Sequence, residues 1–269
     1  MTAEEYLKQG DINSALEQLQ GQVKKDPANA KLRIFLFQIL AVMGQWERAL
    51  TQLKVAGELD AGALAMVTMY KMVIDCEQYR EQVFLGQQEP VIFGEPNEWV
   101  AMLIQAIKFN AQGEHKQAQG LRDMAFELAP VCSGSIDDVP FEWLADSDPR
   151  LGPMLEVMIG GRYLWLPMEN VTNIEIDEPK DLRDVVWLPA RFTWTNGGGS
   201  YGLIPSRYPF SYQHDDALAL SRKTEWQESG TGLYTGLGQK LWATDENEYA
   251  LMDTRSIQFK KAMIMAEGQ

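Results

Sequence analysis

The stretches "GDINSALEQLQGQVKKDPANA" (10–30) and "GQWERALTQLKVAGELDAGA" (44–63) share one pattern. Identical residues recur at an offset of 34 positions in five pairs: Gly10 and Gly44, Ala15 and Ala49, Leu16 and Leu50, Leu19 and Leu53, and Asp26 and Asp60. A period of this length is typical of the tetratricopeptide repeat, a pair of antiparallel helices. The glycine suits the turn between the helices, and the small alanine lets their backbones approach. The sequence therefore begins with stacked helix–turn–helix units.

The repeat pattern continues through most of the N-terminal half. Apolar residues follow helical spacing in "AKLRIFLFQILAVMG" (30–44). A third unit is predicted in 99–130, where Gly113 and Ala118 keep the five-residue gap and Pro130 closes the unit. The segment 61–95 breaks the pattern and ends in a stretch rich in Gly and Pro, which indicates a loop. We expect a tetratricopeptide-like helical domain over 1–130.

Stacked helix pairs leave a groove that commonly binds a helix or a peptide. Phe35, Phe37 and Trp46 are the candidate partner-binding residues of this groove. Phe35 and Trp46 suit the packing between helices equally well. The array could also serve only as a scaffold for the second half of the chain.

The helical pattern ends after Pro130. Residues 131–148 carry Gly, Pro and several Asp, lose the helical periodicity and are predicted to form a linker. A short helix is expected over 149–160, and the later apolar runs, which are bounded by turn formers, are predicted strands: 162–167, 173–176, 184–194, 201–208 and 248–259. We therefore predict an α+β multidomain protein, with a mostly antiparallel β domain and a few short helices over 149–269.

The stretch "RDVVWLPARFTW" (183–194) concentrates residues that commonly anchor partners, namely Arg183, Trp187 and Trp194. Strand alternation places the two tryptophans on opposite faces of the sheet. One interpretation is a buried aromatic core with Arg183 in an ion pair, and the other is a patch that faces a partner. We interpret the stretch mainly as core and keep the three residues as candidate contacts.

Composition excludes several classes of function. The 269 residues carry a net charge of −14, which disfavours nucleic acid and anionic membrane surfaces as partners. No apolar run approaches the roughly 18–20 residues that cross a bilayer. Two cysteines, Cys76 and Cys132, indicate neither a disulfide framework nor a metal site. These features are typical of a cytoplasmic protein.

No set of residues indicates catalysis. The Gly-rich stretch "GTGLYTGLGQK" (230–240) lacks both the ending of a phosphate-binding loop and the glycine spacing of a dinucleotide site. A hydrolase or transferase would need His214, Asp215 and Asp184 to converge. We predict no enzyme, no catalytic or metal-binding residues and no cofactor.

Several motifs in the second half resemble the ImpE family, whose members are also called TagJ or SciE-type proteins. These motifs, in their order along the chain, are "GRYLWLP" (161–167), "PKDLRDVVWLPARF" (179–192), "LIPSRYPFS" (203–211), "LSRKTEW" (220–226) and "GLGQKLW" (236–242). The chain length and the helical repeats also match, so the resemblance covers nearly the whole chain. One departure is Ser221, which stands where the family pattern has glycine.

The resemblance implies a non-catalytic cytoplasmic adaptor of a bacterial type VI secretion system. The implied partner is the N-terminal helix of the small contractile-sheath subunit, and the resemblance also implies assistance to the associated AAA+ unfoldase. A structural homo-oligomer, in which the β domain forms the contact between copies, is a further alternative.

Overall fold

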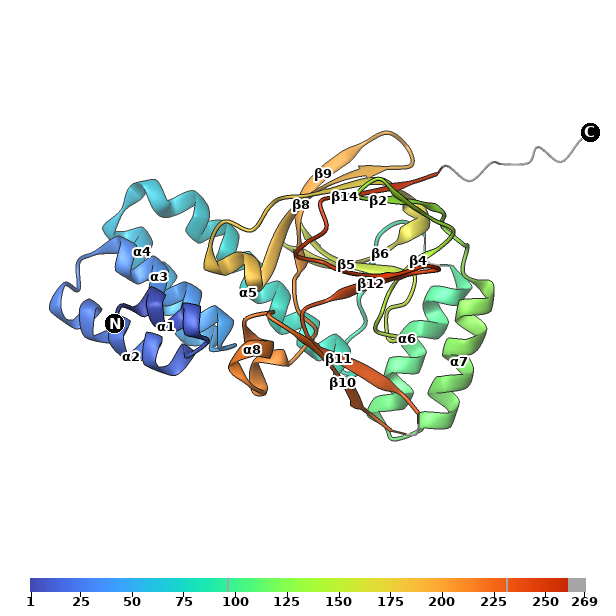
Figure 1. Ribbon diagram of the computed structural model, residues 1–269, viewed down its shortest axis with the longest axis horizontal. Coiled ribbons are helices and arrows are strands. Elements are labelled where there is room, and N and C mark those ends of the chain that lie inside the picture. Colours follow the sequence, from blue (N-terminus) through green and yellow to red (C-terminus); the bar gives the residue numbers. More distant parts are fainter. Residues whose placement is uncertain (96, 231, 261–269) are drawn as a thin grey trace, which may run out of the picture.

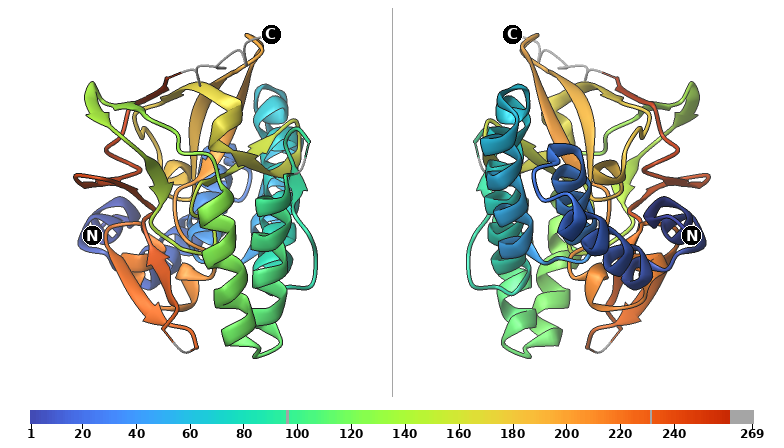
Figure 2. Two further views of the ribbon diagram at one scale, coloured as in Figure 1. Left: turned by 90° about the vertical axis from the view of Figure 1, so that its right-hand side faces the viewer. Right: turned by 90° about the vertical axis from the view of Figure 1, so that its left-hand side faces the viewer.

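The structure is a computed structural model that describes residues 1–95, 97–230 and 232–260. Its N-terminal half is helical, with the elements α1 (Ala3–Gln9), α2 (Ile12–Lys25), α3 (Ala30–Val42), α4 (Trp46–Leu59), η1 (Ala61–Ala63), α5 (Leu64–Phe84), α6 (Glu98–Ala111) and α7 (His115–Leu128). Helices α1–α4 form one end of the molecule, and α6 and α7 lie side by side near the other end (Figures 1 and 2). No described helix has both the length and the apolar character that a membrane crossing requires.

The helical repeat is confirmed. Gly10, Gly44 and Gly113 each lie between paired helices with φ of 83°, 66° and 81°, a left-handed backbone that favours glycine. The alanines that follow them by five residues (Ala15, Ala49 and Ala118) are fully buried where the helices pack. The spacing therefore reflects one repeated local geometry.

The segment 61–95 is more regular than its sequence indicates. It contains α5, a helix of 21 residues, and a short strand, β1 (Val91–Ile92). The buried face of α5 includes the charged residues Glu77 and Arg80. Because these charges interrupt the apolar stripe, the sequence pattern did not reveal the helix.

The second half is mostly antiparallel β structure, as predicted. A nine-stranded sheet has the order β1-β6-β5-β9-β8-β7-β14-β2-β3, in which the pairing of β1 with β6 is parallel. Its other strands are β2 (Gly134–Ile136), β3 (Val139–Phe141), β5 (Met154–Ile159), β6 (Arg162–Pro167), β7 (Val171–Ile176), β8 (Trp187–Trp194), β9 (Gly199–Pro205) and β14 (Ser256–Phe259).

Two smaller sheets and several short helices complete the described chain. One sheet has the order β13 (Glu248–Ala250), β12 (Leu241–Thr244), β4 (Leu144–Asp146). The other pairs β10 (Thr224–Glu228) with β11 (Tyr234–Gly238). The short helices are η2 (Met168–Asn170), η3 (Leu182–Val185), η4 (Ser211–Gln213) and α8 (Asp216–Ala219).

Two local expectations are wrong. The linker predicted over 131–148 contains β2, β3 and β4, because short strands between tight turns resemble a loop in sequence. Asp137 and Asp138 make one of these turns with positive φ. The helix predicted over 149–160 is largely replaced by β5, which pairs with β6 and β9. The division into units over 1–130 and 149–269 stays a prediction, and residues 261–269 lie outside the described part.

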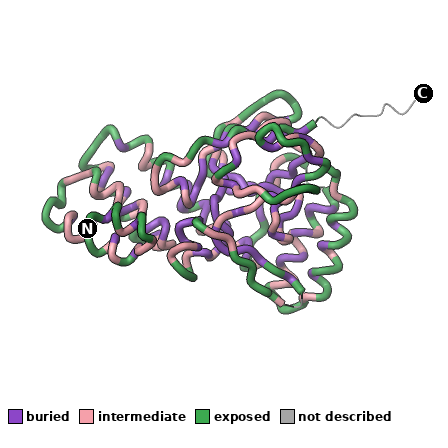
Figure 3. Tube along the Cα trace, in the orientation of Figure 1, coloured by how far each residue is buried: buried purple, intermediate pink, exposed green. Residues whose placement is uncertain are grey.

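The nine-stranded sheet separates two apolar cores. Strand β8 shows this most simply, since Trp187 belongs to the core shared with the helices and Leu188 belongs to the opposite core. Trp194 also lies in the opposite core, which confirms that the two tryptophans occupy different faces. The buried parts of the chain form a band through the middle of the molecule, between helices and strands (Figure 3).

Candidate partner-binding site

The structure brings three of the six predicted contact residues together in one cluster. Phe37 and Trp46 from the helices meet Trp187 from β8 through an aromatic cluster that also contains Tyr70 and Tyr212. Ring centroids of Trp46 and Trp187 are 5.9 Å apart, and those of Tyr70 and Trp187 are also 5.9 Å apart. The expected helical groove is therefore filled by the chain's own second half.

Burial corrects the expectation of a partner surface at four of the six candidate contacts. Phe37, Trp46, Trp187 and Trp194 are all buried, so in this structure their side chains offer no surface to a partner. Trp194 stacks on the ring of Phe192 with the two planes 5° apart.

The remaining two candidates are partly exposed. Phe35 lies in a shallow pocket between α3 and η3, near Leu182. Arg183 forms an ion pair with Asp181, and its guanidinium lies 4.7 Å from the ring centroid of Tyr70. The ion pair agrees with the interpretation of this stretch as part of the fold.

Two arginines from the second half cap helices of the first half. Arg207 donates to the carbonyl oxygens of Ala41 and Val42, at the end of α3, at 3.1 and 2.7 Å. Arg222 donates to the carbonyl oxygens of Leu7 and Lys8, at the end of α1. The last carbonyls of a helix lack partners within the helix, and the C-terminal end of its dipole favours a cation. The arginines therefore join the two halves.

A network of buried charges is a second connection between the two halves of the chain. Arg80 of α5 makes a two-bond contact with Glu156 of β5, at 2.6 and 3.0 Å, and an ion pair with Glu77 at 2.8 Å. Lys240 contacts Glu156 at 2.6 Å and Asp146 at 2.7 Å. All five side chains are at most 5% exposed. Buried charges of this kind are tolerated because each has a partner.

The charges around Glu156 determine its ionisation. Burial alone would raise its pKa, but the positive charges of Arg80 and Lys240 outweigh that effect and hold the pKa well below its usual range. Tyr163 also donates a hydrogen bond to Glu156 at 2.6 Å. Glu156 is thus ionised in the folded protein and has its main partners inside the fold.

The residues of the alternative catalytic set have separate structural contacts. Asp184 accepts hydrogen bonds from the backbone of Lys180 and Asp181 at the start of η3. Asp215 caps α8 and pairs with Lys223, whereas His214 is exposed. In the described ranges, no group of three or more His, Cys, Asp or Glu residues could hold a metal ion. The contacts do not assemble a catalytic centre from these three residues.

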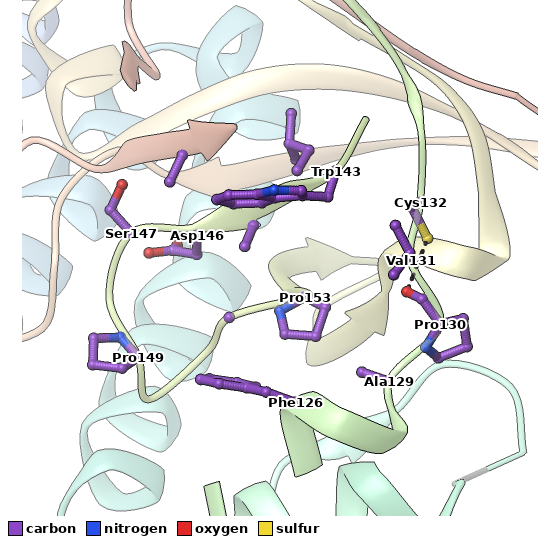
Figure 4. Close-up of a pocket in the computed structure, with 14 residues that line it drawn as sticks. Phe126, Ala129, Pro130, Val131, Cys132, Trp143, Asp146, Ser147, Pro149 and Pro153 are labelled. Carbon is purple, nitrogen blue, oxygen red and sulfur yellow. Dashed lines mark hydrogen bonds between the residues drawn. The ribbon is translucent and has the colours of Figure 1, made fainter. Parts of the chain in front are cut away.

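The candidate site is an open apolar groove between α7 and β4 (Figure 4). It has a volume of about 410 Å³, and its walls come from the end of α7, the segment after it, β4, the turn before β5, and β12. The lining residues are Phe126, Ala129, Pro130, Val131, Cys132, Trp143, Leu144, Ala145, Asp146, Ser147, Pro149, Gly152, Pro153 and Ala243. We call this feature the α7–β4 groove.

Large apolar side chains are exposed along the α7–β4 groove. Trp143 is 41% exposed, Phe126 is 40% exposed and Val131 is 77% exposed. In Figure 4 the indole of Trp143 lies on one side of the groove, with Phe126 and Pro153 on the other. A contiguous patch of exposed apolar side chains is typical of a protein-binding surface.

The floor of the groove is held by polar contacts. Asp146 accepts hydrogen bonds from Lys240 at 2.7 Å and from Tyr208 at 3.1 Å, so its carboxylate is satisfied within the fold. Gly152 has a φ of 55°, and a Cβ there would lie 2.4 Å from the ring of Phe126. The glycine therefore lets Phe126 pack against the turn. The sequence pattern did not indicate this site, because its walls come from segments that are separated in sequence.

Comparison with known proteins gives the family of the chain. The ImpE protein family matches residues 138–258, and a tetratricopeptide repeat family matches residues 6–67. The type VI secretion system accessory component TagJ of Pseudomonas aeruginosa is 53% identical over 97% of this chain and 92% of its own length. A crystal structure of a Vibrio parahaemolyticus protein is 27% identical, with a TM-score of 0.90 over 97% of this chain and 98% of the other. The chain therefore belongs to the ImpE family, which is also called the TagJ family.

Proposed function

We propose that this protein is a cytoplasmic, non-catalytic accessory component of a type VI secretion system. The proposal is supported by the 53% identity with TagJ, which is described as a type VI secretion system accessory component, and by membership of the ImpE family. The protein acts as an adaptor that binds an N-terminal helix of the small sheath subunit. In that role it presents sheath material to the AAA+ unfoldase.

The α7–β4 groove is our proposed position for the helix, and the exposure of Trp143 and Val131 is the observation that carries it. An amphipathic helix docks through apolar side chains at i, i+3, i+4 and i+7. A groove of about 410 Å³ has room for a few such anchors. The face of the helical array that sequence analysis suggested is occupied by the chain itself, which favours the α7–β4 groove instead.

Fluorescence anisotropy of a labelled peptide tests this function. The peptide copies the first helix of the small sheath subunit from the same gene cluster and is titrated with the protein. We expect saturable binding that Trp143→Ala weakens at least tenfold, about 1.4 kcal/mol, because a central aromatic anchor is lost. Trp226→Ala is the matched control, since Trp226 is 39% exposed on β10 and does not line the groove.

Two results would contradict the proposal. Flat anisotropy up to about 100 μM protein, equivalent to about 5–6 kcal/mol, would exclude useful affinity for this helix. Equal loss in the Trp143 and Trp226 variants would place the contact elsewhere. Light scattering of the free protein tests the alternative, a homo-oligomer, through the mass of the particle in solution.

A further inference from the structure

Exposed carboxylates border the α7–β4 groove. Glu142 directly precedes Trp143, and its backbone N–H donates to Asp245 Oδ1 at 2.8 Å. On the same side, Ser147 of the groove wall donates to Glu248 Oε1 at 3.5 Å. These contacts place three exposed acidic side chains, Glu142, Asp245 and Glu248, beside the apolar surface. We call them the acidic rim.

No ion pair within the described residues involves the acidic rim. Across residues 1–95, 97–230 and 232–260, no Lys or Arg forms an ion pair with any of its three members. The nearby cation Arg150 is held by Asp148 at 2.6 Å. Lys240, below the groove floor, is buried between two carboxylates.

Charged residues farther from the groove do not make its surroundings positive. Lys260 lies in a neighbouring pocket that shares Pro130, Val131 and Cys132 with the groove, and Glu169 lies in the same pocket. The whole chain carries a net charge of −14. An approaching segment therefore meets a negative field around an apolar surface.

We infer that the α7–β4 groove selects a cationic amphipathic helix, one whose apolar stripe is flanked by Lys or Arg. This inference rests on the proposed function and specifies the chemistry of the partner segment. The apolar stripe packs on Trp143, Phe126 and Val131, while the flanking cations face the acidic rim. Charges at the edge of an interface mainly set the association rate and the choice of partner.

The same charges disfavour two other occupants. An acidic helix with an identical apolar stripe would place like charges together and bind more weakly. A second copy of this chain also carries a net charge of −14, so the approach of two copies is opposed by repulsion. Charge complementarity thus favours a separate, basic partner segment over self-association.

Three labelled peptides test the inference. They share one apolar stripe at helical spacing and differ only in the flanking residues, which are Lys, Gln or Glu. For the unaltered protein we expect affinity to fall from the Lys to the Gln to the Glu peptide, with at least a tenfold range between the extremes. Between about 50 and about 500 mM salt that range contracts, because salt screens exposed charges.

Matched variants assign the effect to the acidic rim. In Glu142→Gln/Asp245→Asn/Glu248→Gln the preference among the peptides contracts to less than threefold, whereas each substituted side chain keeps an acceptor oxygen. The control Asp75→Asn/Asp177→Asn/Glu178→Gln removes the same charge from exposed positions outside the groove lining and keeps the preference. For the unaltered protein, we expect the association rates measured by stopped-flow mixing to fall in the same order, from the Lys to the Gln to the Glu peptide.

The outcomes separate this inference from the function on which it rests. Equal binding of the three peptides, with continued sensitivity to Trp143→Ala, overturns the charge selection and leaves the groove as a helix site. An equal effect of both triple variants also overturns it, because overall charge would then explain the preference. Binding of none of the peptides overturns the groove and the charge selection together.

Discussion

Ser221 occupies a backbone position that usually suits glycine. Its φ is 55°, in the left-handed region, which agrees with the glycine that the family resemblance leads us to expect at this position. Ser221 Oγ donates to the carbonyl oxygen of Val185 at 2.7 Å, which offsets part of the strain. The serine is therefore accommodated at this position by its hydrogen bond, which links the residues just after α8 to the end of η3.

Substitution at Ser221 separates strain from hydrogen bonding. Ser221→Gly relieves the strain and loses the bond, so the free energy of unfolding changes by less than about 1 kcal/mol. Ser221→Ala keeps the strain and loses the bond, which destabilises by about 1–2 kcal/mol. Urea unfolding measures both, and an alanine variant as stable as the glycine variant would contradict this explanation.

Glu156 makes stability depend on acid pH. Its pKa is lowered in the folded state, whereas in the unfolded chain it titrates near about 4.3. Its stabilising contribution is complete above that unfolded value and decreases as pH falls below it. We expect Glu156→Gln to cost about 3–5 kcal/mol at pH 7, because Arg80 and Lys240 lose a shared counter-charge.

Unfolding measured as a function of pH checks the sign. The difference in the free energy of unfolding between wild type and Glu156→Gln narrows as pH falls from about 5 to about 3. Glu142→Gln is the control, because Glu142 is exposed and forms no ion pair with a described residue, and we expect this variant to keep the wild-type profile. A constant difference across this range would show that Glu156 takes up its proton equally in both states.

Among the helices, α1 and α3 depend on arginines from distant sequence. Arg222 is exposed where it caps α1, whereas Arg207 is buried where it caps α3. Burial lowers the pKa of Arg207 to about 10, so it is still a cation at neutral pH. The two contacts differ mainly in how well water could replace the arginine's hydrogen bonds if the side chain were removed.

The cost of removing each cap follows from that difference. Arg222→Ala destabilises by about 1 kcal/mol, since water can reach the carbonyls of α1. Arg207→Ala costs about 3 kcal/mol or more, because it removes a donor from the buried carbonyl of Val42 and leaves a cavity. Hydrogen exchange of the last turns of α1 and α3, with urea unfolding, measures both effects. Equal costs for the two substitutions would contradict the explanation that burial makes the Arg207 contact the more important of the two.

For the whole molecule, the central finding is that the two halves share a core. Trp46 from the helices packs on Trp187 from the sheet, and Arg80 of α5 binds Glu156 of β5. An extensive shared interface couples the unfolding of the parts that form it. We therefore expect one cooperative transition.

Two spectroscopic signals test that coupling in one urea titration. Far-UV circular dichroism follows mainly the helices, and tryptophan fluorescence reports residues on both sides of the shared core. We predict that the two signals have coincident midpoints. Separate midpoints would mean that 1–130 and 149–269 unfold as independent units.

The sequence predicted features that depend on neighbouring residues. Gly44 and Ala49 mark a local turn and a close helix contact, so their spacing was informative. The burial of Glu77 and Arg80 was not predictable in this way, because Arg80 pairs with Glu156, 76 residues away. The α7–β4 groove was missed for the same reason, since segments separated in sequence form its walls.

Photo-crosslinking measures most directly where the partner helix lies. A benzophenone amino acid replaces Val131 in the α7–β4 groove or, in a second protein, Tyr201, which is 66% exposed in a different apolar pocket near Met72. Each protein is irradiated with the small sheath subunit's helix peptide. We predict a crosslink from position 131 that Trp143→Ala suppresses, and none from position 201. Bound peptide that crosslinks from 201 and not from 131 would contradict the assignment of the groove.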